Sequence, residues 1–377
     1  MTMSKFKHIF VKIKDRIGWK MLDSYILKKF LSSFLLSIVL LMTIVVVFDL
    51  SDNLSRFLSN NAPLKAIITE RYFNFIPIFA NLFTNLFTFI SVIWFTSKLS
   101  NQNEIISIFN GGVSFNRFMF PYLTGALIIA FASFSLSNFY IPQANKQLNT
   151  FNEKYLNRKK DFSRFDIHIK VDENTYVYME RWKKTSLKGE NFTYEKLGRL
   201  FTTYKLKASE IQYNKEQDNW TLYNYVIRTI SPNGTERIRS GDRMDTVFNF
   251  KHTEFSKTIA TAETMSFRAL RKFIKEEKEK GSSLVKYYEI EKHKRMTTPF
   301  GTIIMALLGL SVASRKTQRG VGVHIFVGLA LSFLFIFFQQ VSDTFAVSGN
   351  LSPFIASWLP NGIYLVICII MIRFAQK

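Results

Sequence analysis

The chain has 377 residues, of which 47% are hydrophobic and 39 are phenylalanine, and its formal net charge is +22. So much phenylalanine is rare in a soluble domain of this size, and because 21% of the residues are charged, the apolar residues must be gathered in blocks. The basic residues are scattered among those blocks without an aromatic-interleaved patch, which excludes a nucleic-acid-binding protein. The single cysteine, Cys368, excludes an intrachain disulfide.

Apolar stretches approach the length that a helix needs to cross a hydrocarbon core of about 30 Å, which is about 20 residues. Six of them hold no Asp, Glu, Lys or Arg, and they are residues 30–48, 72–95, 118–141, 299–313, 321–341 and 354–372. The first is too long for a signal-peptide core and lacks a small-residue cleavage pattern, so we expect a retained helix. Before it, residues 1–20 alternate basic and apolar residues at helical spacing, which predicts an amphipathic helix on an anionic membrane face.

Basic residues in the short loops predict how the six spans are oriented. Those at the N-terminus, in the loops after the second and fourth spans, and at the C-terminus all fall on one side, which is the cytoplasm. Both termini are therefore expected in the cytoplasm, and the long segment between the third and fourth spans is expected outside it. The basic run 293–295 lies on the outer side and departs from this trend.

The segment 142–264 reads as a soluble insert in which turn signals separate short runs rich in β-branched and aromatic residues. These runs are 165–171, 175–182, 200–206, 210–213, 220–229 and 235–239. Many short strands at this spacing predict a sandwich or barrel. Residues 266–292 then follow a helical pattern, with Ser266 as cap and an interruption at Gly281. We expect three parts: 1–141 with the first three spans, 142–264 as the β domain, and 265–377 with connecting helices and the last three spans.

The alternation of side chains in residues 175–182 could show which face of this strand is apolar. Strict alternation would send Tyr176, Tyr178, Glu180 and Trp182 to one face of the strand, and Val177, Met179 and Arg181 to the other. Both faces have apolar members, so the pattern does not decide which one points inward. A closed sandwich with a packed core and an open sheet remain alternatives.

No pattern of catalytic residues is present. The five histidines and the one cysteine lack metal-ligand spacing, and neither a nucleophile elbow GxSxG nor a phosphate-binding GxxxxGK[ST] occurs. Carboxylates within the spans, the usual relays of ion-driven transporters, are missing as well. We therefore predict no catalytic residue, no metal and no cofactor, and if the protein moves a substrate, the energy must come from a partner.

The second span carries a polar stripe. Asn74, Asn81 and Asn85 are followed by Thr88 and Ser91 at spacings that keep all five on one helical face. Two interpretations are open: hydrogen bonds between helices, or the lining of a cavity. The other faces are rich in phenylalanine, and these side chains would contact lipid or form an apolar binding wall. The candidate cavity-lining residues are Asn74, Asn81, Asn85, Phe79 and Phe83.

The loop 101–114, NQNEIISIFNGGVS, has the pattern of a short helix on the cytoplasmic side. Glu104, Ile105 and Ile108 recur at helical spacing, and Gly111-Gly112 would end the helix. Such a helix is either a capped connector or a docking element that presents its acidic residue to another protein.

Several segments in their order resemble the LptF/LptG (YjgP/YjgQ) family of permease subunits of the bacterial lipopolysaccharide exporter. They are MLDSYILKKFL at the first span, NEIISIFNGGVS in the loop, TYVYMERW in the insert, EKHKRMTTPFG entering span four, RKTQRGVGV in the second cytoplasmic loop and LSPFIASWLPN at the last span. The similarity runs over nearly the whole chain. It implies an inner-membrane permease with six spans and a periplasmic β-jellyroll.

The resemblance also implies partners: a paralogous permease in a heterodimer, a dimer of a cytoplasmic ABC ATPase, single-span and soluble periplasmic β-jellyroll proteins, and lipopolysaccharide as the cargo. Glu104 matches the acidic residue of the family's coupling helix, and Gly112 matches its glycine. Together with Ile105 and Ile108 they are the candidate ATPase-coupling residues. A membrane-anchored sensor or scaffold with a ligand-binding β domain is the alternative, and it would need no acidic coupling loop.

Contacts to lipid phosphate cannot simply be carried over from the family. Some members have a lysine at the outer end of the first span, where this chain has Asp49, and its nearest cation is Arg56. Arginine suits phosphate because its planar fork donates two hydrogen bonds, while lysine acts as a point charge. The candidate phosphate-binding residues at the outer surface are Arg56, Lys65, Arg71, Lys294 and Arg295.

Overall fold

A computed structural model describes residues 19–156, 163–198, 202–231, 234–314 and 321–375. The amphipathic helix predicted for residues 1–20 lies outside these ranges except for its last two residues. The basic residues 315, 316 and 319 lie outside them. Contacts divide the chain into two compact units, and each is described by itself. One comprises residues 1–52, 72–141 and 293–377, and the other comprises residues 53–71 and 142–292.

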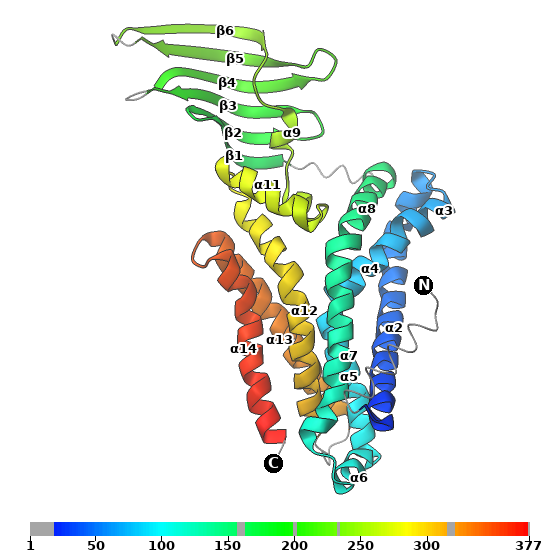
Figure 1. The fold of residues 1–377 in the computed structure, drawn as a ribbon. Coiled ribbons are helices and arrows are strands. Elements are labelled where there is room, and N and C mark those ends of the chain that lie inside the picture. The colour runs from blue at the N-terminus through cyan, green and yellow to red at the C-terminus, as the bar shows by residue number, and fades with distance from the viewer. Residues whose placement is uncertain (1–18, 157–162, 199–201, 232–233, 315–320, 376–377) are drawn as a thin grey trace, which may run out of the picture. The chain divides into compact units, whose positions relative to one another are not determined.

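Long apolar helices form the first unit, called here the membrane unit (Figure 1). They are α2 (Met21–Ser59), α4 (Phe73–Leu82), α5 (Thr84–Asn101), α7 (Phe115–Ser135), α12 (Val285–Ala313), α13 (Val321–Ser348) and α14 (Pro353–Ala375). Five helices of the described residues, counting α7 with its continuation, are long and apolar enough to cross a membrane, and the bent pair ending in α4 and α5 makes a sixth candidate. The predicted six-span architecture is confirmed.

The second candidate span differs from the prediction because it is broken. The helical stretch Leu64–Leu82, made of α3 (Leu64–Ala66), the π-helix η1 (Ile67–Tyr72) and α4, meets α5 at an angle of 66°. The bend lies at Phe83, whose backbone (φ −99°, ψ 13°) leaves the helical region. The segment 49–71, which separates the first two predicted spans, is largely helical: α2 continues to Ser59, and α3 and η1 precede α4.

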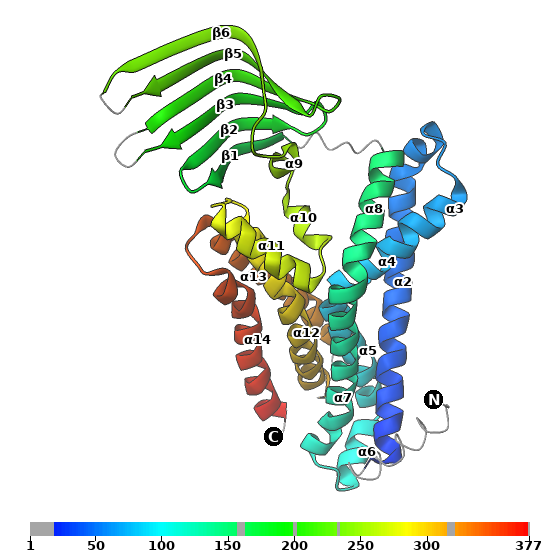
Figure 2. The same ribbon diagram turned by 45° about the horizontal axis from the view of Figure 1, so that its top comes forward.

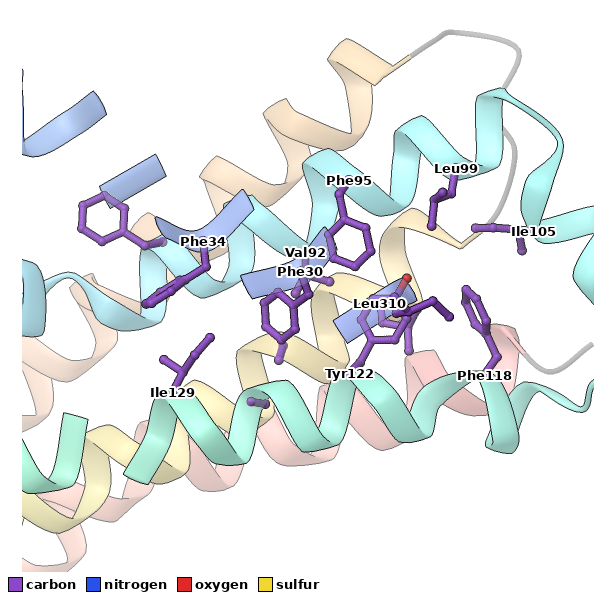
Figure 3. Close-up of a cluster of buried hydrophobic side chains, with 14 of the residues drawn as sticks. Phe30, Phe34, Val92, Phe95, Leu99, Ile105, Phe118, Tyr122, Ile129 and Leu310 are labelled. Atoms are coloured by element: carbon purple, nitrogen blue, oxygen red, sulfur yellow. The ribbon is translucent and has the colours of Figure 1, made fainter. Parts of the chain in front are cut away.

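Close helix packing in the membrane unit depends on a small residue. A Cβ at Gly125 of α7 would lie 2.4 Å from Cδ1 of Phe30 on α2, so only glycine allows this approach. The ring of Phe30 stacks on those of Phe95 and Tyr122, at centroid distances of 5.9 and 6.3 Å. These rings join α2, α5 and α7 in one buried cluster (Figure 3).

The second unit, called here the sheet unit, contains residues 53–71 and the helix α8 (Ile141–Tyr155). The π-helix η2 (Leu136–Tyr140) connects α8 to α7. The strands of the sheet unit are β1 (Ser163–Asp172), β2 (Thr175–Lys183), β3 (Lys188–Leu197), β4 (Thr202–Asn214), β5 (Asn219–Ile230) and β6 (Glu236–Thr246). They pair antiparallel in the order β1-β2-β3-β4-β5-β6. After them come α9 (His252–Phe255), α10 (Ile259–Glu263) and α11 (Phe267–Glu279).

The all-β insert is confirmed, but the described strands form one sheet rather than the two packed layers of a sandwich or a closed barrel. Strand β3 escaped prediction because its sequence, KGENFTYEKL, is dominated by polar and charged residues. The runs 200–206 and 210–213 merge into β4. The helix after the sheet was predicted correctly: Oγ of Ser266 accepts a hydrogen bond from the amide of Ala269, and Gly281 (φ +67°) follows its end.

A row of unpaired residues crosses the whole sheet. In each pair of neighbouring strands, one residue of each strand is skipped in the pairing. The register is the same before and after the skipped position. In strand order the skipped residues are Asp166, Glu180, Asn191, Ser209, Asn224 and Asp242. On alternate strands, Asp166, Asn191 and Asn224 have left-handed φ angles of 49°, 50° and 49°. Asn and Asp tolerate this conformation better than other side chains, which explains their place in this row.

The unpaired row changes which residues face inward. In β2, Val177 and Met179 are buried on one side of the row, and Trp182, not Arg181, is buried beyond it. The strict alternation expected for residues 175–182 is therefore wrong after Glu180, because that residue breaks the period of two. The inner face, defined by Val177, Met179 and Trp182, carries the apolar cluster of the sheet unit.

Candidate functional site

The helix α6 (Glu104–Asn110) forms at the expected place in the loop between α5 and α7. It begins after Asn103 (φ 60°), and Gly112 adopts φ +82°, a conformation suited to glycine. Ile105 is 2% exposed and belongs to the buried cluster with Leu99 and Phe118 (Figure 3). Ile105 therefore packs α6 against the buried cluster of the membrane unit.

The outward side of α6 includes a residue that the sequence reasoning missed. Ile106 is 45% exposed, and its neighbours Ser107 and Asn110 are exposed as well, whereas Ile108 is half-buried. The signal was available, because on a helix Ile106 points away from the side shared by Ile105 and Ile108.

Glu104 is held by the first helix. The hydroxyl of Tyr25 on α2 donates a hydrogen bond to Oε2 of Glu104 at 3.1 Å. The ring of Tyr25 in turn lies 5.4 Å from Nζ of Lys29, a cation–π distance. The carboxylate is thus oriented by α2 while the residue itself remains partly exposed.

An ion pair with a buried carboxylate and a partly exposed arginine lies at the same end of α2. Asp23 is 2% exposed, its Oδ2 is 2.5 Å from Nη2 of Arg117 on α7, and it also accepts a hydrogen bond from the amide of Lys20 at 2.6 Å. The sequence reasoning used Arg117 only for orientation and did not single out Asp23. Acidic residues are common in a first helical turn, so the position alone gave no sign of this ion pair.

The asparagine stripe makes hydrogen bonds between helices. Asn81 donates to Oγ of Ser137 at 3.0 Å and accepts from Oγ of Ser133 at 2.8 Å, while Asn85 accepts from Oγ1 of Thr302 on α12 at 2.7 Å. Such bonds in a membrane contribute about 0.6 kcal/mol each. The first of the two interpretations of the stripe is therefore realised at Asn81 and Asn85.

The remaining cavity candidates are packed within the membrane unit. Asn74 is 3% exposed. The half-buried ring of Phe79 stacks on Phe75 with 4.1 Å between centroids, and Phe83 packs against Phe87 at the bend of the second span. Phe79, Phe83 and the stripe come from one broken helix, so these five candidates lie close along the chain but not on a single straight face.

The outer cations of the sheet unit separate into exposed and buried ones. Arg56 near the end of α2 and Lys65 on α3 are exposed, and Arg56 makes a long contact of 3.4 Å to Oδ1 of Asn53. Arg71 is 2% exposed: its Nη1 donates to Oδ1 of Asn152 at 2.6 Å, and its guanidinium faces Phe57. The guanidinium of Arg71 is thus buried in contacts within the sheet unit.

The cations of α12 lie in the membrane unit. Lys294 lies 2.7 Å from Oδ2 of Asp343 on α13, and Asp343 is 7% exposed. Arg295 is 4% exposed. Asp343 was missed because the predicted fifth span ends at residue 341, whereas α13 continues to Ser348. No carboxylate lies within the predicted spans, and Asp343 lies two residues beyond the predicted end of the fifth span.

Within the described ranges, no group of three or more His, Cys, Asp or Glu side chains could hold a metal ion. A family model described as lipopolysaccharide export system permease LptF/LptG matches residues 24–373. The chain belongs to the LptF/LptG family. No curated protein matches the chain. Because the match covers nearly the whole chain, the helical spans and the inserted sheet are those of one permease.

Membership defines the general role of this permease. It is a non-catalytic, multi-pass inner-membrane subunit of the lipopolysaccharide export system, and it works with other components of that system. Three of the four candidate coupling residues, Glu104, Ile105 and Ile108, lie on α6, and Gly112 lies in the turn after it. Of the five candidate phosphate-binding cations, Arg56, Lys65 and Arg71 belong to the sheet unit, and Lys294 and Arg295 belong to the membrane unit.

Proposed function

We propose that this permease is one half of an ATP-driven exporter that extracts lipopolysaccharide from the inner membrane and passes it to a periplasmic bridge of β-jellyroll proteins. The family match over residues 24–373 is the observation that carries the proposal. The permease pairs with a paralogous permease and receives energy from a cytoplasmic ABC ATPase dimer. This division of labour agrees with a sequence that has no phosphate-binding motif of its own.

The proposed orientation has both termini in the cytoplasm and the sheet unit in the periplasm. Its support is the positive-inside rule: Lys98 and Arg117 flank the α6 corner, and Arg373 lies in the last turn of α14. A long inserted domain translocates whatever its charge, so the basic residues of the sheet unit do not oppose this orientation.

The proposed site of ATPase coupling is α6. Glu104 presents a carboxylate that an arginine or a helix N-terminus of the ATPase would contact. Gly112 allows the turn that returns the chain to α7. Ile105 and Ile108 hold α6 on the helix bundle, so a push on α6 would be transmitted to α2 and α7.

Arg56 and Lys65 are the proposed contacts to lipid phosphate, because both are exposed cations beyond the outer end of an apolar helix stretch. Arg71 and Arg295 are buried and Lys294 is paired with Asp343, so they contribute only if the helices around them rearrange. The proposed inner wall of the lipid cavity comprises Asn74, Asn81, Asn85, Phe79 and Phe83. Its half-buried rings would contact acyl chains, and its amides would hold the wall together.

The inner face of the sheet is the proposed surface that receives the acyl chains. An exposed CH₂ group costs about 0.8 kcal/mol in water, so a carrier must offer an apolar surface along the whole path. Among the described strands, β6 pairs only with β5 and β1 only with β2, which leaves edges that could pair with β-jellyroll partners.

The test is to purify the permease with its native partners and to reconstitute the complex in proteoliposomes that contain lipopolysaccharide. Copurification of an ABC ATPase and ATP-dependent release of lipopolysaccharide to a soluble β-jellyroll protein are expected. A chain that copurifies without an ATPase and binds a ligand through its sheet would instead be a sensor or scaffold.

A further inference from the structure

The segment after β6 crosses the inner face of the sheet before it reaches α9 (Figure 2). We call residues 247–251, VFNFK, the aromatic strap. Its side chains alternate: Phe248 and Phe250 are half-buried toward the sheet, while Val247, Asn249 and Lys251 are exposed. The strap is thus an amphipathic segment, bent at Asn249 and Phe250, whose apolar side lies on the apolar face of the sheet.

The two rings of the strap pack on the centre of the inner face. They stack on each other with 4.8 Å between centroids. Phe248 lies 5.5 Å from Phe192 and 5.2 Å from Tyr194 on β3, and Phe250 lies 5.4 Å from Trp220 on β5. The strap therefore covers ring surface contributed by two strands that are not neighbours in the sheet.

Ring contacts hold the strap, and backbone pairing does not. The register of β5 with β6 ends at the pair Trp220 and Thr246. Among the residues that the structure describes, no backbone hydrogen bond joins residues 247–250 to the sheet. A segment fixed by side chains alone can be displaced by another apolar group without breaking the sheet.

A cavity of about 750 Å³ opens beside the strap. Its apolar lining includes Val171 and the two strap phenylalanines. Its charged lining comprises three lysines, Lys170, Lys251 and Lys280, and two carboxylates, Asp218 and Glu254. An apolar surface whose charged border has more cations than carboxylates is complementary to an amphiphile that has acyl chains and an anionic head group.

We propose that the aromatic strap is a displaceable wall of the acyl-chain site, in which Phe248 and Phe250 occupy the surface that an acyl chain takes during transfer. The proposal rests on the proposed function, since it assumes that lipopolysaccharide passes along the inner face. When no lipid is bound, the strap shields the apolar rings from water. An arriving acyl chain exchanges one apolar contact for another, so opening exposes little apolar surface.

Photo-crosslinking in the full permease complex tests the strap. p-Benzoyl-L-phenylalanine replaces Tyr194, which lies under Phe248, and lipopolysaccharide capture is measured in proteoliposomes with and without ATP. With Phe248 and Phe250 intact, capture should require ATP. In the variant Phe248→Ala/Phe250→Ala, capture without ATP should rise about tenfold, the occupancy change for ~1.4 kcal/mol of lost ring contacts. The control Val226→Ala/Ile238→Ala removes two exposed apolar side chains from the other face of β5 and β6 and should behave like the parent.

Unchanged capture in the Phe248→Ala/Phe250→Ala variant, in a complex whose parent captures lipid with ATP, overturns the strap alone. No capture in the parent during active export overturns the strap and the passage of lipid along this face together. A second measurement needs no substitution: hydroxyl-radical labelling of the half-buried rings of Phe248 and Phe250 in the wild-type complex. Labelling should increase with lipopolysaccharide and ATP, while the buried Trp182 stays unlabelled, and equal labelling in both states contradicts a displaceable wall.

Discussion

The hydroxyl of Tyr25 donates a hydrogen bond to the carboxylate of Glu104, and so links the start of α2 to α6 across 79 residues of sequence. The ion pair of Asp23 and Arg117 joins α2 to α7 at the same end. A force applied to α6 therefore acts on a carboxylate that the first span already holds. In the proposed exporter, this link would carry motion from an ATPase into α2.

The first prediction separates binding of the ATPase from coupling. Glu104→Ala should weaken ATPase copurification, because the partner group loses its counter-charge at a cost of about 1–3 kcal/mol. Tyr25→Phe should leave copurification intact but lower the lipopolysaccharide released per ATP hydrolysed, since Glu104 loses its link to α2. Both quantities are measured in reconstituted complexes.

Tyr178→Phe is the matched control for Tyr25→Phe. Its hydroxyl also donates to a carboxylate, that of Asp166, over 3.1 Å, but it lies in the sheet unit. It should leave the coupling ratio unchanged. Normal copurification and normal release in Glu104→Ala would remove α6 from the proposed coupling path.

The second prediction concerns lipid phosphate. Arg56→Glu should impair lipopolysaccharide loading, because it replaces an exposed cation by a charge that repels phosphate. Lys275→Glu reverses an exposed cation on α11 and should have little effect. Loading is measured by binding of lipopolysaccharide to the complex without ATP. Equal and negligible effects of both reversals would indicate that Arg56 only anchors the helix at the interface.

The third prediction concerns the pair of Lys294 and Asp343. Lys294→Met leaves the buried carboxylate of Asp343 without its cation and should destabilise the permease by about 1–3 kcal/mol, since the Lys294 side chain is itself 36% exposed. The double variant Lys294→Met/Asp343→Leu removes both charges and should recover most of that loss. Thermal unfolding in detergent measures both. If stability returns in the double variant but export does not, the pair has a role in transport beyond packing.

The fourth prediction tests the orientation. Alkaline phosphatase is active only outside the cytoplasm, so a fusion after Asn214 should give activity and a fusion after Ser107 should not. Asn214 ends β4 and Ser107 lies on the exposed side of α6. The reverse pattern of activities would refute the proposed topology.

The fifth prediction is a pH dependence in the sheet unit. Partial burial raises the pKa of Glu254, but hydrogen bonds from Lys257 and Lys280 outweigh it, so the pKa lies below its ordinary value of 4.5. The stability from these contacts is present above pH 4.5 and is lost as the pH falls through the folded-state pKa. The protection factors of residues 252–280, which are amide exchange rates corrected for the intrinsic effect of pH, should therefore fall in acid. Glu254→Gln should flatten that dependence, and an unchanged profile would contradict it.

The spans could be predicted because a membrane helix needs an uninterrupted apolar stretch, which a single sequence displays directly. The break at Phe83 could not, since no proline or glycine marks that position and the bend depends on packing. The inward residues of β2 were mispredicted beyond Glu180 because the unpaired row is a property of six strands in register. Likewise, Asp23 and Asp343 gain their roles from partners far away in sequence.

The order of the strands has a consequence for how the protein is made. Every described strand of the sheet pairs with its neighbours in sequence, so each new hairpin can add to the previous one as soon as it is synthesised. Nothing in that pairing waits for α12, α13 or α14. The aromatic strap, however, follows β6, and until it is synthesised the rings of Phe192, Tyr194 and Trp220 face water. During synthesis there is therefore an interval in which the apolar inner face of the sheet is not yet covered by the strap. In that interval a chaperone or a lipid could bind this face before the strap does.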